Sequence, residues 1–272
     1  MNLHDSFQTR IARLIVGSMM VLGLAAGVAL AQEPSKQAAL LTRLASGNED
    51  QRADVVIELG SMLSAYPAEQ TTVDALSQTL RRDSSPLVRA LAARAMELSR
   101  DERFVTTLLA SLKTEKDISI RKASIYALAY QRSSQVVGQV VGILLPLMKD
   151  KKQDIRAAAT FALAEIGDPI ARDSLIDLLE KRGKDEDIFA RSQAARGLGK
   201  MADPESIEAL IVALNRDKAQ DVRRASAQAL GLIAGKQDAK AVEALESAKH
   251  DVDPYLVSAA ETALSRINSR NP

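Results

Sequence analysis

A short pattern that returns about every 34 residues constrains this chain more than any other feature. The pattern is an acid, an apolar residue, an Arg and a run rich in Ala and Leu, as in DIRAAATFAL at 154–163 and DVRRASAQAL at 221–230. The Arg position, called the marker below, falls at 52, 89, 121, 156, 191, 223 and 257, where the last copy has Val. These near-equal intervals predict a repeat architecture.

Each interval contains two helical patterns separated by a short polar turn. Gly-Asp-Pro at 167–169 and Ala-Asp-Pro at 202–204 end one unit and begin the next, because a small residue stops a helix and Pro is tolerated in the first turn of another. No period-two strand pattern is found. The expected helix pairs are 37–46 with 50–65, 70–81 with 85–98, 101–113 with 117–131, 134–149 with 153–167, 170–182 with 186–201, 204–215 with 219–234, and 239–249 with 253–268.

The predicted fold is therefore all-α. One helix pair cannot bury its apolar side alone, whereas stacked pairs share one core. We expect a single elongated α-solenoid of about seven helix pairs over residues 37–268. A short segment at 32–36 precedes it and a tail at 269–272 follows it.

The first 31 residues have the three parts of a secretory signal peptide. Arg10 and Arg13 form a basic region, an uncharged apolar run covers 14–30, and Ala29 and Ala31 provide a small-x-small cleavage site. We expect cleavage after Ala31 and an exported, periplasmic protein. The alternative is an uncleaved anchor, because the run is about as long as the shortest membrane-spanning helices. Membrane contact is expected only in that case.

Composition excludes several classes of function. The 36 basic and 35 acidic residues give a net charge of +1, and removal of residues 1–31 leaves 34 of each, so no nucleic-acid partner is expected. The chain has no Cys, and His250, in a polar turn, is the one His after residue 31. No nucleotide-binding or nucleophile motif is present. We therefore expect no enzyme activity, no cofactor and no metal site.

The repeated pattern resembles the HEAT-repeat family, most closely the HEAT-like repeats of the phycobilisome-lyase type. The residues that carry the resemblance are the D-x-V-R-x-x-A-x-x-A-L-like runs over about 37–268, with Pro146 inside a first helix as in many HEAT units. Two units depart from the pattern. The first has Asp54 and Val55 where others have Ala or Ser, and the last lacks the Arg.

The recurring Asp and Arg are interpreted as structural. An Asp near the start of a second helix can cap free N–H groups, and the Arg can reach an Asp of a neighbouring unit. The resemblance implies an inter-repeat ladder made by Asp154, Arg156, Asp187, Arg191, Asp221 and Arg223. HEAT-like metal hydroxylases carry paired His-Glu motifs, which this sequence lacks.

The resemblance also implies that the second helices line a concave face. The residue five after each marker should point away from the core, and this row reads Ile57, Arg94, Tyr126, Phe161, Arg196, Gln228 and Thr262. With Tyr130, nine after its marker, the centre of the row gives the candidate partner-binding residues Arg94, Tyr126, Tyr130, Phe161 and Arg196, since aromatic and Arg side chains are enriched in binding hot spots. The competing interpretation is that Tyr126 and Phe161 pack against neighbouring second helices.

The resulting expectation is an exported, non-enzymatic HEAT-repeat scaffold that binds a protein or peptide partner along its concave face. The alternative is a lyase-associated role like that of the phycobilisome lyases, which attach a tetrapyrrole to a protein. The single His and the lack of a recognisable catalytic set weigh against the alternative. A nucleic-acid binder conflicts with the neutral charge and the absence of Trp.

Overall fold

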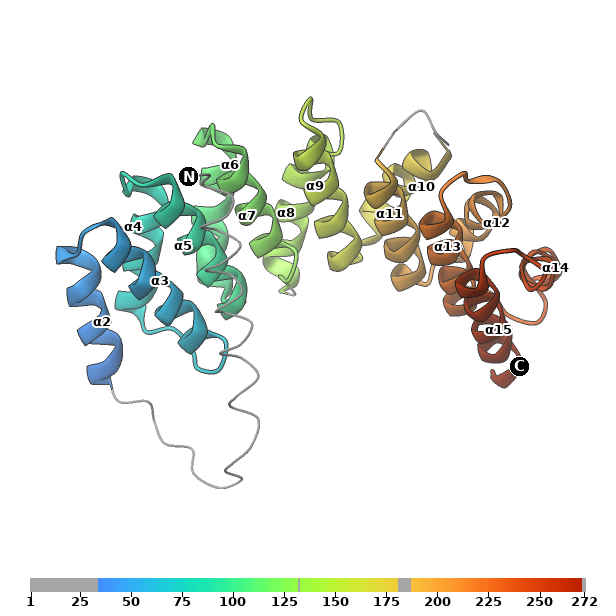
Figure 1. Ribbon diagram of the computed structural model, residues 1–272, viewed down its shortest axis with the longest axis horizontal. Coiled ribbons are helices and arrows are strands. Elements are labelled where there is room, and N and C mark those ends of the chain that lie inside the picture. The colour runs from blue at the N-terminus through green and yellow to red at the C-terminus, as the bar shows by residue number, and fades with distance from the viewer. Residues whose placement is uncertain (1–33, 132, 181–186, 271–272) are drawn as a thin grey trace, which may run out of the picture. The chain divides into compact units, whose positions relative to one another are not determined.

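The computed structural model of the protein describes residues 34–131, 133–180 and 187–270 (Figure 1). The predicted signal peptide, with Ala29 and Ala31, lies outside them. The described residues form fourteen α-helices and no β-strand, which confirms the all-α solenoid class predicted from the sequence.

The helices form seven consecutive pairs. They are α2 (Pro34–Ser46), α3 (Glu49–Leu63), α4 (Gln70–Arg82), α5 (Pro86–Ser99), α6 (Val105–Thr114), α7 (Ile118–Leu128), α8 (Ser134–Leu147), α9 (Gln153–Ile166), α10 (Arg172–Glu180), α11 (Ile188–Met201), α12 (Ile207–Arg216), α13 (Gln220–Ile233), α14 (Ala239–Ala248) and α15 (Pro254–Ser269). Most of these helices begin and end within two residues of the bounds expected from the sequence.

The chain divides into two compact units, with the boundary between Gln131 and Arg132. The sequence alone predicted one continuous stack over 37–268. In the first unit the second helices α3, α5 and α7 pack side by side, and in the second unit α9, α11, α13 and α15 do the same. The first helices of each unit pack against them, so each unit buries its Leu, Ile, Val and Ala side chains between two layers of helices.

In three repeats, a short 3-10 turn precedes the first helix, and the sequence pattern did not reveal it. These turns are η1 (Glu102–Phe104) before α6, η2 (Pro169–Ala171) before α10 and η3 (Pro204–Ser206) before α12. Each turn follows a residue with positive φ, namely Arg100 (54°), Gly167 (70°) and Ala202 (54°). The Asp that comes next accepts a hydrogen bond from the backbone N–H two residues on, at 2.9–3.0 Å. This side-chain bond tightens the start of the next repeat.

Successive second helices approach most closely where small residues meet. Gly60, Gly199 and Gly231 each lie eight residues after a marker, and the residue they face, six after the next marker, is an Ala. A Cβ added to Gly231 would lie 2.6 Å from the Cα of Ala263, and one added to Gly199 would lie 2.8 Å from the Cα of Ala229. No larger side chain fits there without separating the helices.

A ladder of ion pairs joins neighbouring repeats near the start of the second helices. The Arg at the marker binds an acid in the turn of the following repeat. The nitrogen–oxygen distances are 2.7 Å for Arg52 Nε to Asp83 Oδ2, 3.0 Å for Arg89 Nε to Glu115 Oε2, 2.9 Å for Arg191 Nε to Asp217 Oδ2 and 2.7 Å for Arg223 Nη1 to Asp251 Oδ2. Each pair therefore connects two repeats of the same unit.

The acids named for the ladder from the sequence lie at the start of their own second helices, where the capping interpretation expected them. Asp187 caps α11 by accepting the backbone N–H of Ala190 at 2.9 Å, and Asp154 and Asp221 lie in the first turns of α9 and α13. Arg156 donates to the carbonyl oxygen of Asp150 at 3.0 Å. The acids that pair with the markers lie six residues before the next marker: Asp83, Glu115, Asp217 and Asp251.

The ladder also sets the ionisation of its carboxylates. Burial raises the pKa of Asp83, but hydrogen bonds from Arg52 and from the backbone N–H of Ser85 outweigh it, so that its pKa lies below the usual value. The pKa of Asp251 is lowered by the backbone N–H of Asp253 and by Arg223. Both carboxylates are thus held in the charged form that the Arg requires.

We predict that Gly231→Ala destabilises the second unit. Ala in place of Gly inside a helix usually stabilises by about 0.5–1 kcal/mol. Here the new Cβ meets the backbone of Ala263, and we expect a net loss of about 1–3 kcal/mol in the free energy of unfolding, measured with urea. The matched control is Gly138→Ala in α8, where no atom lies within 4 Å, and it should stabilise. A gain in both variants would contradict the tight crossing.

Replacing Arg191 with Ala should cost more stability than replacing Arg223 with Ala. The Arg191 and Asp217 side chains are 3% and 1% exposed, whereas those of Arg223 and Asp251 are 20% and 19% exposed. An unpaired buried carboxylate costs about 3–5 kcal/mol, and water can solvate the exposed one. Urea unfolding of the two variants measures the difference. Equal losses would show that burial does not set the strength of the ladder.

The melting temperature should fall in acid. Because the pKa values of Asp83, Asp251 and Glu115 are lower in the folded state, their stabilisation is fully present above the unfolded value of about 4. It is lost as the pH drops below about 4, through the lowered folded values. Thermal unfolding followed by circular dichroism at pH 7, 5, 4 and 3 measures this. Asp251→Asn should be less stable at pH 7 and should lose less between pH 5 and 3, and a parallel fall would refute the assignment.

Candidate functional site

The exposed side of the second helices is the surface that the sequence singled out. Five residues after their markers, Arg196, Gln228 and Thr262 are exposed, and Ile57, Arg94, Tyr126 and Phe161 are partly exposed. Within each unit, this row therefore borders solvent on successive second helices.

The five candidate partner-binding residues are divided between the two units. Arg94 lies on α5, Tyr126 on α7 and Tyr130 in the turn after α7, all in the first unit, whereas Phe161 on α9 and Arg196 on α11 belong to the second. The helix expected over 117–131 ends at Leu128, so that Tyr130 lies beyond it.

The surroundings of these five side chains differ. Arg94 is paired with Glu97, and the guanidinium of Arg100 lies 5.1 Å above the centre of the Tyr130 ring. Tyr126 and Phe161 are each half-buried. Arg196 is exposed and makes no ion pair with any other residue that the structure describes. Arg196 is thus the candidate most available to a partner.

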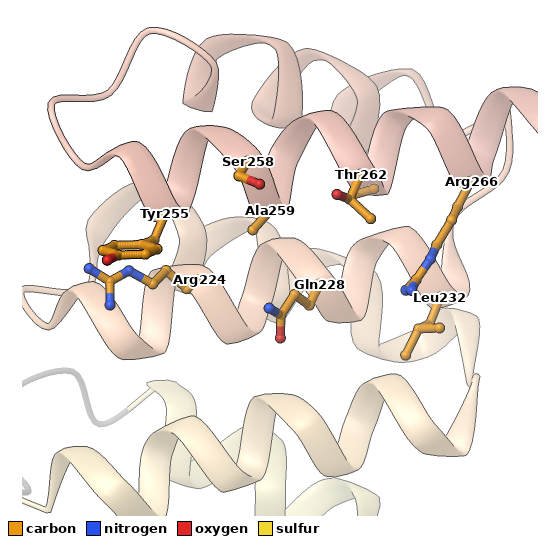
Figure 2. A pocket seen from close by; sticks show the side chains of 9 residues that line it. Arg224, Gln228, Leu232, Tyr255, Ser258, Ala259, Thr262 and Arg266 are labelled. Atoms are coloured by element: carbon orange, nitrogen blue, oxygen red, sulfur yellow. The ribbon is translucent and has the colours of Figure 1, made fainter.

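A groove runs between α13 and α15 on this same side of the second unit (Figure 2). Its volume is about 650 Å³. The residues that line it are Arg224, Gln228, Leu232, Tyr255, Ser258, Ala259, Thr262, Ala263 and Arg266. Gln228 and Thr262 belong to the row predicted from the sequence. The other polar and aromatic lining residues lie at different offsets from the markers, which is why the row alone did not reveal the groove.

One end of the groove is a rigid platform. The guanidinium of Arg224 lies 5.0 Å from the centre of the Tyr255 ring (Figure 2). The Nε of Arg224 donates to Asp253 Oδ2 at 2.6 Å. The Arg224 hydrogen bond lowers the pKa of Asp253 below its usual value. Tyr255 is 71% exposed although it is held by the cation–π contact, so that it presents a flat apolar surface to solvent.

The middle and the far end of the groove have unused polar groups. The exposed side chains of Gln228, Ser258 and Thr262 make no hydrogen bond with other described residues. At the far end, Arg266 extends toward Leu232, which is 43% exposed, and its guanidinium has no ion-pair partner in the described chain (Figure 2). The lining contains two Arg and no acidic residue.

The described residues contain no group of three or more His, Cys, Asp or Glu placed to hold a metal ion. His250 is exposed in the turn after α14. None of the helices that the structure describes has the length and apolar character needed to cross a membrane.

Several solved structures share the fold. The complex of CpcE and CpcF of phycocyanin lyase from Nostoc sp. has a TM-score of 0.51 and 19% identity, and the match covers 90% of this chain and 100% of that one. Two engineered proteins each match with a TM-score of 0.50, at 20% identity over 86% of this chain and 97% of the other, and at 18% identity over 85% and 78%. At these identities, the likeness shows the fold alone. No curated protein sequence matches the chain.

The family model for HEAT repeats matches residues 37–129, 115–187 and 178–265. These matches cover most of the chain and all seven helix pairs, and they agree with the markers, the ladder and the crossing of small residues described above. The chain therefore belongs to the HEAT-repeat family.

Proposed function

We propose that this protein is a non-enzymatic scaffold that binds a protein or peptide partner along the exposed side of its second helices. The observation that carries the proposal is the groove between α13 and α15. Its lining offers an aromatic ring, together with an Arg that has no ion-pair partner and three polar side chains that make no hydrogen bond within the described part of the chain. Aromatic and Arg side chains supply much of the energy at protein interfaces.

Rigidity supports the same proposal. The backbone under the groove is fixed by the contact of Gly231 with Ala263 and by the pair of Arg223 with Asp251. A surface that keeps its shape before binding loses little conformational entropy on binding. A fold alone does not fix function. The likeness to the phycocyanin lyase complex is one of fold, and no residue of this groove favours tetrapyrrole attachment over partner binding.

The wider surface is part of the proposal. We assign partner contact in the first unit to Arg94, Tyr126 and Tyr130, and in the second unit to Phe161 and Arg196, in addition to the groove. We further propose that residues 1–31 direct export and that the scaffold acts in the periplasm, since the basic region, the apolar run and Ala29-x-Ala31 follow the signal-peptide pattern.

Site-specific photo-crosslinking in intact cells tests the proposal. A photoreactive residue at position 196 or 228, on the exposed side of α11 or α13, should link the protein to one discrete partner. The same residue at position 216, at the exposed C-terminal end of the first helix α12, should not. The linked species should be released by osmotic shock with Gln32 as its first residue.

The outcomes separate the parts of the proposal. Equal crosslinking from 196 and 216, or none from 196 and 228, would refute a binding surface on the second helices. Recovery of intact Met1 in the membrane pellet would refute cleavage and leave an anchored scaffold. A Tyr126→Ala, Phe161→Ala double variant should weaken capture while the helical circular dichroism is retained, if both aromatics contact the partner.

A further inference from the structure

The groove between α13 and α15 presents different chemistry at its two ends. The Tyr255 ring, held by Arg224, forms an apolar platform near the start of both helices. The guanidinium of Arg266 lies near the other end and has no ion-pair partner among the described residues (Figure 2). A ligand that fills the groove therefore contacts the Tyr255 ring at one end and the Arg266 guanidinium at the other.

Between the ends, the groove is lined by two Ala and by three uncharged polar side chains. Ala259 and Ala263 are buried and form its floor, and the side chains of Gln228, Ser258 and Thr262 border it. These three side chains can donate to and accept from a peptide backbone. Small floor residues allow a main chain to approach closely, which favours an extended segment over a bulky helix.

The length of the groove fixes the spacing of a ligand's groups. Tyr255 and Arg266 both lie on α15 and are eleven residues apart in the sequence. At about 1.5 Å per residue, this helical span is about 16 Å. An extended chain rises about 3.3 Å per residue, so that about five residues bridge the two ends.

Charge around the groove selects the sign of the ligand. Asp253 and Asp221 at its edge are engaged by Arg224, at 2.6 and 3.1 Å. Glu246 pairs with Lys249 at 2.9 Å, and neither Glu246 nor Glu261 lines the groove. Asp253 and Asp221 are thus already paired, whereas Arg266 has no ion-pair partner among the described residues. A carboxylate is the natural partner of an Arg that has no other one.

We propose that this groove binds an extended, acidic segment of a partner protein, in which an aromatic side chain stacks on Tyr255 and an Asp or Glu about five residues away pairs with Arg266. The inference rests on the proposed function, because it names the class of segment that the scaffold recognises. Gln228, Ser258 and Thr262 hold the backbone between the two anchors.

Fluorescence anisotropy with a synthetic peptide tests this. The probe is an eight-residue labelled peptide with one Phe and two Asp separated by Gly and Ser, made in both orders, against the full chain at about 50 mM salt. One order should bind saturably, and the same peptide with Lys in place of Asp should not. Arg266→Gln and Tyr255→Ala should each weaken binding by about tenfold or more, as the loss of one charged or aromatic anchor implies.

The matched control is Arg216→Gln, which removes an exposed Arg of the same unit outside the groove and should leave the affinity unchanged. Circular dichroism checks that each variant is folded. Failure of both peptide orders, or equal weakening by Arg216→Gln and Arg266→Gln, overturns the inference. If photo-crosslinking from 196 or 228 still captures a partner, only the inference falls. If crosslinking also fails, the proposed function falls with it.

Discussion

The contact between small residues on successive second helices is the constraint on which the rest of each unit depends. With Gly231 against Ala263 and Gly199 against Ala229, the helix axes come closer than any pair of larger side chains would allow. The residues three positions before these glycines, Arg196 and Gln228, are exposed on the open side of their helices. The row that includes Arg196, Gln228 and Thr262 is therefore a consequence of packing, and the groove follows from it.

The ion-pair ladder acts at one edge of the same layer. Packing of small residues alone does not fix the register of two helices, because Ala and Gly can slide past one another with little change in contact. A pair such as Arg191 with Asp217 has a single favourable geometry and fixes the register between repeats. Apolar packing thus sets the distance between second helices and charge pairing sets their alignment. The two devices act at opposite sides of the marker, the acids before it and the small residues after it.

The helices and their pairing could be predicted from the sequence, because a stack of alike units repeats its core positions at a fixed interval. The 3-10 turns could not, since they depend on a backbone bond to Asp101, Asp168 or Asp203 that adds no apolar period. The acids of the ladder could have been predicted, because an Asp or Glu lies six residues before each marker after the first. A search for apolar periodicity alone does not detect them. The groove could not be predicted from a single row of the repeat, because its lining residues lie at different offsets from the marker at 257. Tyr255 precedes this marker, whereas Arg266 follows it by nine residues.

The position of the groove couples its occupancy to local stability. One wall of the groove, α15, is the last helix that the structure describes. Among the described second helices it packs mainly on α13, whereas α13 packs on both α11 and α15. Elements of this kind open at lower free energy than the rest of a repeat array. A ligand that touches both α13 and α15 binds only while α15 is docked, and it shifts that local equilibrium toward the closed form by mass action. Occupancy of the groove would therefore be recorded in the backbone amides of α15 as slower hydrogen exchange, far beyond the atoms that the ligand touches.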